Sequence, residues 1–174
     1  MGTGIFEDFD GDGLKDLFQC SASYNRNVKY YKNMGNGKFK DLTASANLEG
    51  INGGANCRQA DINNDGHIDI FIMRGGWLGI DHVNGLLRNN GDNTFSDIAF
   101  YSGITTQGAT HTMDFADINK DGFVDFFVAN EDLPCEMWLN MGNETVVNVG
   151  DSDVLDCGLV KGMVFTDYND DMVS

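Results

Sequence analysis

The feature that most constrains the fold is an acidic, glycine-containing nonapeptide that occurs three times. It reads "DFDGDGLKD" at residues 8–16, "DINNDGHID" at 61–69 and "DINKDGFVD" at 117–125, and we call these segments loops 1, 2 and 3. Their first residues are 53 and 56 positions apart, and a shortened copy begins a further 50 residues on, at Asp167. A period of this length indicates a chain built from one repeated supersecondary unit.

A second landmark recurs in phase with the loops. Each loop is followed by "YYKNMGNGKFKDL", "LLRNNGDNTFSDI" or "MWLNMGNETVVNV", which place Gly35, Gly91 and Gly142 at equivalent positions. Asn-Xaa-Gly between apolar residues predicts a hairpin, because Asn and Gly tolerate the positive φ that tight turns need.

Each unit can therefore be interpreted as four short strands. The first strand enters the acidic loop ("GIFEDF", "NCRQAD", "HTMDFAD"), the second leaves it ("KDLFQC", "IDIFIM", "VDFFVA"), and the third and fourth flank the Asn-Xaa-Gly turn. Alternation and β-branched or aromatic residues favour strands, and no amphipathic helix is expected. Four strands per unit predict an all-β fold of propeller blades, and a β-sandwich with coincidental spacing is the alternative.

The whole chain, 1–174, is thus predicted to be part of a β-propeller. We expect three four-stranded antiparallel blades at about residues 3–52, 53–107 and 108–160, followed by the first strand of a fourth within 161–174. Propellers close with about four to eight blades. The remaining blades are expected to come from a longer parent chain or from self-association.

Composition narrows the possible partners. The chain has 27 acidic and 11 basic residues, a formal net charge of -16. Nucleic acid is therefore an improbable partner, whereas a cation that compensates the charge is expected. No secretion signal and no apolar segment long enough to span a membrane occurs in this sequence.

The loops have the donor pattern of a calcium site. Oxygen-bearing side chains occupy positions 1, 3, 5 and 9, glycine occupies position 6, and the backbone carbonyl at position 7 adds a further oxygen. Ca²⁺ takes about six to eight oxygen ligands in a flexible geometry, which one such loop can supply. The predicted ligands are Asp8, Asp10, Asp12, Leu14 and Asp16; Asp61, Asn63, Asp65, His67 and Asp69; and Asp117, Asn119, Asp121, Phe123 and Asp125.

Two alternatives apply to these loops. They could be solvated acidic turns, although three copies in phase argue against this, and Mg²⁺ suits them less because it requires stricter octahedral geometry. A fourth site at Asp167, Asn169 and Asp171 is expected to be incomplete, since Met172 stands where glycine belongs. Loop 1 has four carboxylates where the others have three and an amide, so it is expected to bind Ca²⁺ most tightly.

The repeats resemble a known family. The segments "ADINNDGHIDIFIMRGGW", "LLRNNGDNTFSDIAFYSGI" and "FADINKDGFVDFFVANE" are similar to the FG-GAP/VCBS repeats of integrin-α-type propellers, and most similar to the group of cartilage acidic protein and the ASPIC/UnbV-associated bacterial proteins. The resemblance implies an extracellular or cell-surface propeller with structural Ca²⁺ between the first two strands of each blade. Affinities typical of extracellular modules, about 10⁻⁴ to 10⁻³ M, also favour an external location.

The expected function is an adhesion or interaction scaffold that binds an extracellular protein or glycan and is not an enzyme. The segment 74–85 offers Trp77, Asp81 and His82, and Trp77 either binds a ligand or packs between blades. The alternative is a fragment of a calcium-dependent propeller enzyme such as a polysaccharide lyase. No catalytic residues are predicted, because the three histidines are scattered and the loops account for most carboxylates.

The cysteines and one glycosylation sequon complete the analysis. Cys20, Cys57, Cys135 and Cys157 form no CxxC pair, which argues against a zinc ribbon or a thioredoxin-type site. They are either small buried residues or disulfide-bonded, and Cys135–Cys157 is the first choice for a bridge. Asn143-Glu144-Thr145 is an N-glycosylation sequon at a predicted turn.

Overall fold

The structure is a computed structural model that describes residues 2–23, 25–74, 83–105, 108–131, 133–150 and 162–166. The described part contains three four-stranded antiparallel sheets, each with its strands in sequence order. Blade 1 contains β1 (Gly4–Glu7), β2 (Asp16–Gln19), β3 (Lys29–Asn33) and β4 (Phe39–Asp41); blade 2 contains β5 (Asn56–Ala60), β6 (Asp69–Met73), β7 (Gly85–Asn89) and β8 (Phe95–Asp97); blade 3 contains β9 (Thr110–Ala116), β10 (Asp125–Asn130), β11 (Glu136–Asn140) and β12 (Val146–Asn148).

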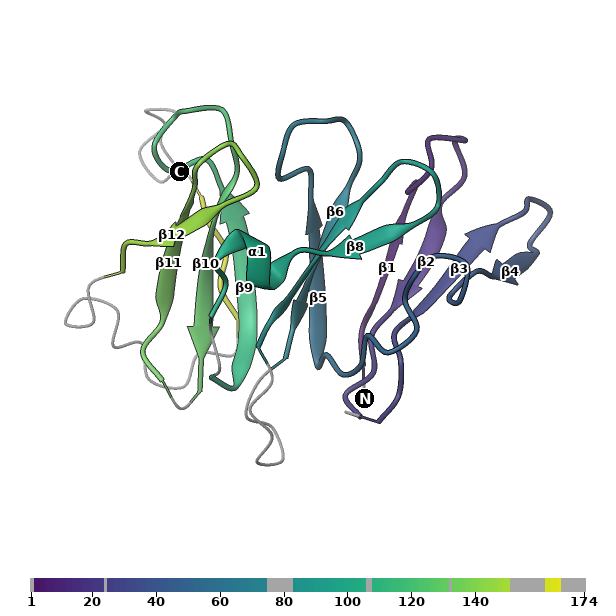
Figure 1. The fold of residues 1–174 in the computed structure, drawn as a ribbon, viewed down its shortest axis with the longest axis horizontal. Helices are drawn as coiled ribbons and strands as arrows, with labels where there is room; N and C mark the ends of the chain where they lie inside the picture. Colours follow the sequence, from purple (N-terminus) through teal and green to yellow (C-terminus); the bar gives the residue numbers. More distant parts are fainter. Residues whose placement is uncertain are drawn as a thin grey trace.

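The three sheets stand side by side in chain order, and loops 1, 2 and 3 lie at the same end of the molecule, at the top of Figure 1. This arrangement confirms the all-β prediction of propeller blades, and the β-sandwich alternative is wrong. One helical turn was not predicted: α1 (Ala99–Ser102) follows β8 and ends at Gly103, which has a φ of 90°. This single turn of four residues is too short to be an amphipathic helix.

The register of the first two strands is the same in every blade. The residue before the loop and the last loop residue are directly opposite each other, as Glu7 and Asp16 are in blade 1 and Ala60 and Asp69 in blade 2. Blade 3 repeats this pairing with Ala116 opposite Asp125. Because each loop joins neighbouring antiparallel strands, it must turn back within its own nine residues.

Blades 1 and 2 are held together by a cluster of aromatic rings. Phe9, the second residue of loop 1, lies with its ring centroid 5.8 Å from that of Phe95 in blade 2. Tyr30 lies 5.5 Å from Phe95 and 5.9 Å from Phe9, and both contacts are edge-to-face. Such contacts add to the hydrophobic stabilisation of buried rings. The loops therefore contribute an apolar anchor to the blade interface as well as acidic side chains.

The interface between blades 2 and 3 follows the same plan. Ile62, the second residue of loop 2, is buried in a cluster with Phe71, Met113 and Phe126. Phe126 stacks on Trp138 with the ring planes 17° apart. The apolar residue at position 2 of loops 1 and 2 thus fills the interface with the next blade.

The segment 162–166 lies against the outer face of blade 3, where it is drawn in yellow in Figure 1. The backbone N–H of Phe165 donates to Asp114 Oδ2 at 3.0 Å, and the Phe165 ring packs edge-on against Phe127. The remainder of the predicted fourth blade is outside the described residues.

The cysteines divide into two groups. Cys20 and Cys57 are free and buried at the interface of blades 1 and 2. A hydrogen bond with Cys57, together with burial, raises the pKa of Cys20. Cys135 is disulfide-bonded, and its predicted partner Cys157 is outside the described residues. The interpretation of all four as free buried thiols is therefore wrong for Cys135.

Candidate metal centres

The first aspartate of each loop organises the turn. In loop 2 the two carboxylate oxygens of Asp61 accept hydrogen bonds from the backbone N–H groups of Asp65 at 3.1 Å and Gly66 at 2.8 Å. The same pair of bonds forms around Asp8 in loop 1 and Asp117 in loop 3. Position 1 therefore fixes the path of the backbone through positions 5 and 6.

Positions 3 and 5 repeat this behaviour on a shorter span. Asn63 Oδ1 accepts from the N–H of Asp65 at 3.1 Å, and Asp65 Oδ1 accepts from the N–H of His67 at 2.8 Å. Equivalent bonds occur in loops 1 and 3. The side-chain oxygens at alternate positions therefore accept hydrogen bonds from the backbone of their own loop. In loop 1, carboxylate oxygens of Asp8, Asp10 and Asp16 also lie within 4.8 Å of one another.

The glycine at position 6 is required by its backbone conformation. Gly66 has a φ of 86° and Gly122 a φ of 91°, and no described atom lies within 4 Å of a Cβ added at either residue. The constraint is therefore conformational and not steric. Position 4 also has positive φ, with Asn64 at 58° and Lys120 at 62°, which the sequence analysis did not predict.

The aspartate at position 9 is buried in every loop, and both of its carboxylate oxygens accept hydrogen bonds. Asp69 is 1% exposed, and its oxygens accept from the N–H of Asn89 at 2.7 Å and of Ile62 at 3.1 Å. Burial raises the pKa of Asp69 to about 7, and burial likewise raises the pKa of Asp16. Asp125 accepts from the equivalent backbone N–H groups of blade 3, those of Asn140 and Ile118. Position 9 thus connects its loop to the third strand of the blade, a role that the sequence analysis missed.

A second missed set is the asparagine two residues before each hairpin glycine. The side-chain amide of Asn89 donates to the carbonyl of Phe9 in blade 1 at 2.8 Å, and that of Asn140 donates to the carbonyl of Ile62 in blade 2 at 2.7 Å. The equivalent Asn33 donates to Lys15 in its own blade. An Asn in phase with the glycine was the available signal, but it indicated only a turn.

The side chains at position 7 pack on the hairpin of the same blade. A Cβ added at Gly91 would overlap the His67 ring, and one added at Gly142 would lie 2.7 Å from the Phe123 ring. Leu14, in loop 1, is 39% exposed. These contacts give His67 and Phe123 a packing role, and the role of the backbone carbonyls at this position as ligands stays a prediction.

The residue that precedes this asparagine is of a different type in each blade. In blade 1 this residue is Lys32, whose ammonium forms ion pairs with Asp10 and, at 2.7 Å, with Asp12. These ion pairs raise the pKa of Lys32 although burial opposes the charged form. In blade 2 it is Arg88, which pairs with Glu144 of blade 3 at 2.9 Å, and in blade 3 it is Leu139.

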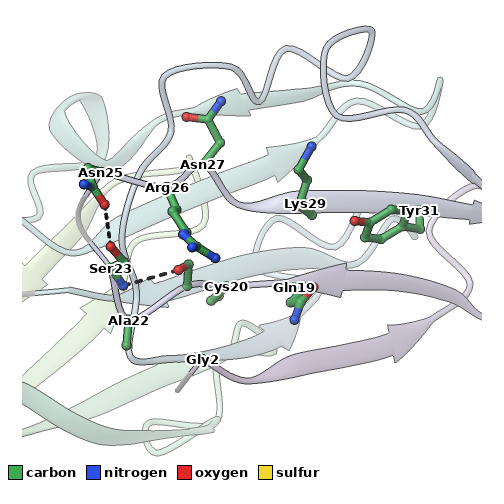
Figure 2. A pocket seen from close by; sticks show the side chains of 11 residues that line it. Gly2, Gln19, Cys20, Ala22, Ser23, Asn25, Arg26, Asn27, Lys29 and Tyr31 are labelled. Atoms are coloured by element: carbon green, nitrogen blue, oxygen red, sulfur yellow. Dashed lines mark hydrogen bonds between the residues drawn. The ribbon is translucent and has the colours of Figure 1, made fainter.

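A cavity of about 890 Å³ lies at the other end of blade 1, around the connection from β2 to β3. Figure 2 shows Arg26 and Lys29 beside Ser23, Asn25 and Tyr31 in its wall. None of the described residues that line it is acidic, although the chain has 27 acidic residues. Its lining offers hydroxyl, amide and cationic groups.

Most of the remaining residues that the sequence analysis singled out lie outside the described part of the chain. Trp77, Asp81 and His82 are outside the described residues, as are Asp167, Asn169 and Asp171. His111 lies within 2.7 Å of Glu131. The part of the chain that the structure describes contains no helix that could span a bilayer.

The chain matches the model of a known protein family. The family model described as an FG-GAP-like repeat matches residues 8–72 and 76–128, which include all three loops up to and including Asp125. No curated protein matches the chain. The family match covers more than half of the sequence. The matched model describes the repeated unit.

Proposed function

The chain belongs to the family of FG-GAP-like repeat proteins, and from this premise we propose that it is a calcium-stabilised, extracellular or cell-surface propeller module that presents a surface to a protein or glycan. FG-GAP repeats are typical of extracellular proteins, and their propeller fold is generally not enzymatic. The narrower similarity to the cartilage acidic protein and ASPIC/UnbV-associated group stays a prediction.

The observation that carries the calcium proposal is the common frame of the three loops. In each loop the oxygens of positions 1, 3 and 5 accept backbone N–H groups in the same pattern, and the predicted donor set consists of oxygen atoms alone. Oxygen-only donor sets suit hard cations such as Ca²⁺. Asp8, Asp61 and Asp117, with the oxygens that follow them, would hold the ion, which would supply positive charge where carboxylates converge.

Electrostatics gives the ion a structural role. Carboxylates confined within a few ångströms repel one another and disfavour the folded state. Three bound Ca²⁺ ions would reduce the formal net charge from -16 to -10, since each ion adds two. Loops 1 and 2 also place an apolar residue, Phe9 and Ile62 respectively, in the interface with the next blade. Calcium would therefore stabilise the interfaces as well as the loops.

A thermal melt in EGTA and across a Ca²⁺ titration tests this proposal. The melting temperature of the wild-type chain is expected to rise with Ca²⁺, and this rise should be much smaller in the double variant Asp65→Ala, Asp121→Ala. Asp92→Ala is the matched control, because Asp92 is an exposed turn aspartate outside the loops that bonds only to Thr94 among the described residues. A wild-type melting temperature that does not respond to Ca²⁺ would refute the proposal.

We place the partner surface at the cavity beside Arg26 and Lys29. In a strongly acidic chain, a hollow whose described lining has no carboxylate favours a ligand with an anionic group. Arg26 supplies the cation for it, because the Lys29 ammonium already pairs with Asp41 at 3.0 Å. The neighbouring Ser23, Asn25 and Tyr31 offer hydrogen bonds, as a glycan with carboxylate groups requires. Glycan and matrix-protein arrays probed with the wild-type chain and with Arg26→Glu test this placement, since only ligands of the cavity should be lost in the variant.

The outer face of blade 1 fits a further blade of the same kind. Leu17 and Tyr31 are directly opposite each other on this face and are partly exposed, and Phe6, opposite Leu17, is 59% exposed. Their equivalents Ile70 and Leu87 in blade 2 are fully buried against blade 1. We therefore expect another blade to cover Phe6 and Leu17, and the mass of the chain in solution would show whether a second copy supplies it.

A further inference from the structure

Loop 1 differs from the other two loops because it already holds a cation of the chain itself. The ammonium of Lys32 forms ion pairs with Asp10 and Asp12, the residues at positions 3 and 5. The Lys32 side chain is 20% exposed and that of Asp10 only 8% exposed. The Lys32–Asp10 pair therefore has little solvent contact and is weakly screened, whereas the Asp12 side chain is 35% exposed. Charge-assisted bonds of this kind are among the stronger hydrogen bonds in proteins.

In blades 2 and 3 the residue equivalent to Lys32 forms no ion pair with a loop carboxylate in the described part of the chain. Arg88 occupies the position of Lys32 in blade 2, but it donates to both carboxylate oxygens of Glu144, at 2.9 and 3.1 Å. In blade 3 the position is Leu139, and in the described part of the chain no ion pair involves the carboxylates of loop 3. The three repeats thus share a loop frame and differ in the local cation.

We propose that Lys32 is a built-in counter-cation of loop 1, which competes with Ca²⁺ for Asp10 and Asp12, so that loops 2 and 3 take up Ca²⁺ at lower concentrations than loop 1. This inference rests on the proposed calcium function. The proposal reverses the order of Ca²⁺ affinities expected from the number of carboxylates. Loop 1 has a fourth carboxylate, but it also has the positive charge of Lys32, which lies 20 to 22 residues further along the sequence than Asp12 and Asp10.

Ca²⁺ can bind loop 1 while Lys32 stays in place or after Lys32 has moved away, and Lys32 weakens the binding in both cases. If Lys32 stays in place, its charge repels a divalent ion bound to the same two carboxylates. If Lys32 leaves, its charge-assisted bonds to Asp10 and Asp12 are lost as the ion binds. In either case Lys32 makes the free energy of Ca²⁺ binding at loop 1 less favourable. Loop 1 would then fill only at the upper end of the calcium range and would act as the module's weak site.

Reciprocal substitutions test the proposal. Lys32→Met removes the cation from loop 1, and Leu139→Lys introduces one at the equivalent position beside loop 3. Lys40→Met is the matched control, because Lys40 lies directly opposite Lys32 on β4 and its removal changes the net charge equally without removing an ion pair to the loop. Calorimetric titration of the EGTA-stripped chains with Ca²⁺ gives the dissociation constants, and native mass spectrometry counts the bound ions.

The wild-type chain is expected to bind two ions tightly and a third more weakly. Lys32→Met should tighten the third ion by about tenfold or more, and Leu139→Lys should weaken one of the two tight ions by a similar factor, as expected for one charge close to a divalent ion. Lys40→Met should change no constant by more than about twofold, since exposed charges are screened. Asp8→Ala should abolish the weak ion alone.

Two results would overturn the inference in different ways. Three ions of equal affinity in the wild-type chain, unchanged by Lys32→Met and by Leu139→Lys, would refute the role of Lys32 and leave the calcium function standing. Absence of bound Ca²⁺ from the wild type and from every variant would instead refute the proposed function on which the inference rests. If Lys32→Met does not fold, Leu139→Lys still decides between these results, because it leaves loop 1 untouched.

Discussion

The side-chain amide of Asn140 donates a hydrogen bond of 2.7 Å to the backbone carbonyl of Ile62, which lies in the acidic loop of the preceding blade. Asn89 makes the equivalent bond to Phe9, one blade earlier. Both asparagines are almost completely buried. A buried polar group that is left without its hydrogen-bond partner destabilises the folded state. These two bonds therefore fix loops 1 and 2 against the next blade.

Asn140→Ala is therefore expected to destabilise the chain by about 1–3 kcal/mol, because the carbonyl of Ile62 loses its partner in the interface. Asn33→Ala is the matched control. Asn33 makes the same turn bond to Gly35, but its amide donates to Lys15 within its own blade. Urea unfolding monitored by tryptophan fluorescence measures both variants. Equal losses would mean that the turn bond, and not the bond between blades, carries the stabilisation.

Phe95→Ala should be among the most destabilising substitutions, at about 3–5 kcal/mol. Phe95 is 2% exposed, and its ring contacts those of Phe9, Phe18 and Tyr30 at the interface of blades 1 and 2. Phe100→Ala removes the same ring from a position that is 96% exposed, and we expect a change within about 0.5 kcal/mol. Thermal unfolding distinguishes the two. A mild effect of Phe95→Ala would show that the interface contributes little to stability.

Gly54→Ala is expected to cost about 2–5 kcal/mol, from backbone strain together with overpacking. Gly54 is buried with a φ of 115°, and an added Cβ would lie 2.6 Å from the Cγ2 methyl of Ile72. At Gly37 the φ is 73° and no described atom lies within 4 Å of an added Cβ, so Gly37→Ala should cost only about 1–2 kcal/mol. Chemical denaturation compares them, and equal costs would assign the whole effect to φ.

Asp41 is expected to titrate well below a normal aspartate. Hydrogen bonds from Thr43, followed by the Lys29 ammonium at 3.0 Å, lower the pKa of Asp41 from 3.8 to about 2. Because the folded-state pKa is the lower one, the stabilisation is present above pH of about 4 and is lost as the pH falls toward 2. An NMR titration of the carboxyl group measures this directly. Lys29→Met should raise the pKa only slightly, and a wild-type value near 3.8 would contradict the assignment.

The sequence by itself determined the loops and the class of fold. Asp61, Asp65 and Gly66 could be predicted in their places because the backbone bonds that the side chains of Asp61, Asn63 and Asp65 accept span at most five residues and Gly66 must adopt positive φ. The strand pattern was equally local, since alternation and turn residues specify it within a few positions. The helical turn α1 was too short to leave a periodic signal.

Only the tertiary structure decided how the loops are connected and which cation each loop meets. Asn89 reaches the carbonyl of Phe9 across 80 residues, and the two meet only when blades 1 and 2 pack together. Lys32 lies beside Asp10 because β3 pairs with β2 and brings its side chain under loop 1, whereas Leu139 occupies the same place beside loop 3. Long-range pairing sets these distances, and electrostatic and hydrogen-bond energies depend on distance. The number of carboxylates was readable from the sequence, but the charge beside them was not.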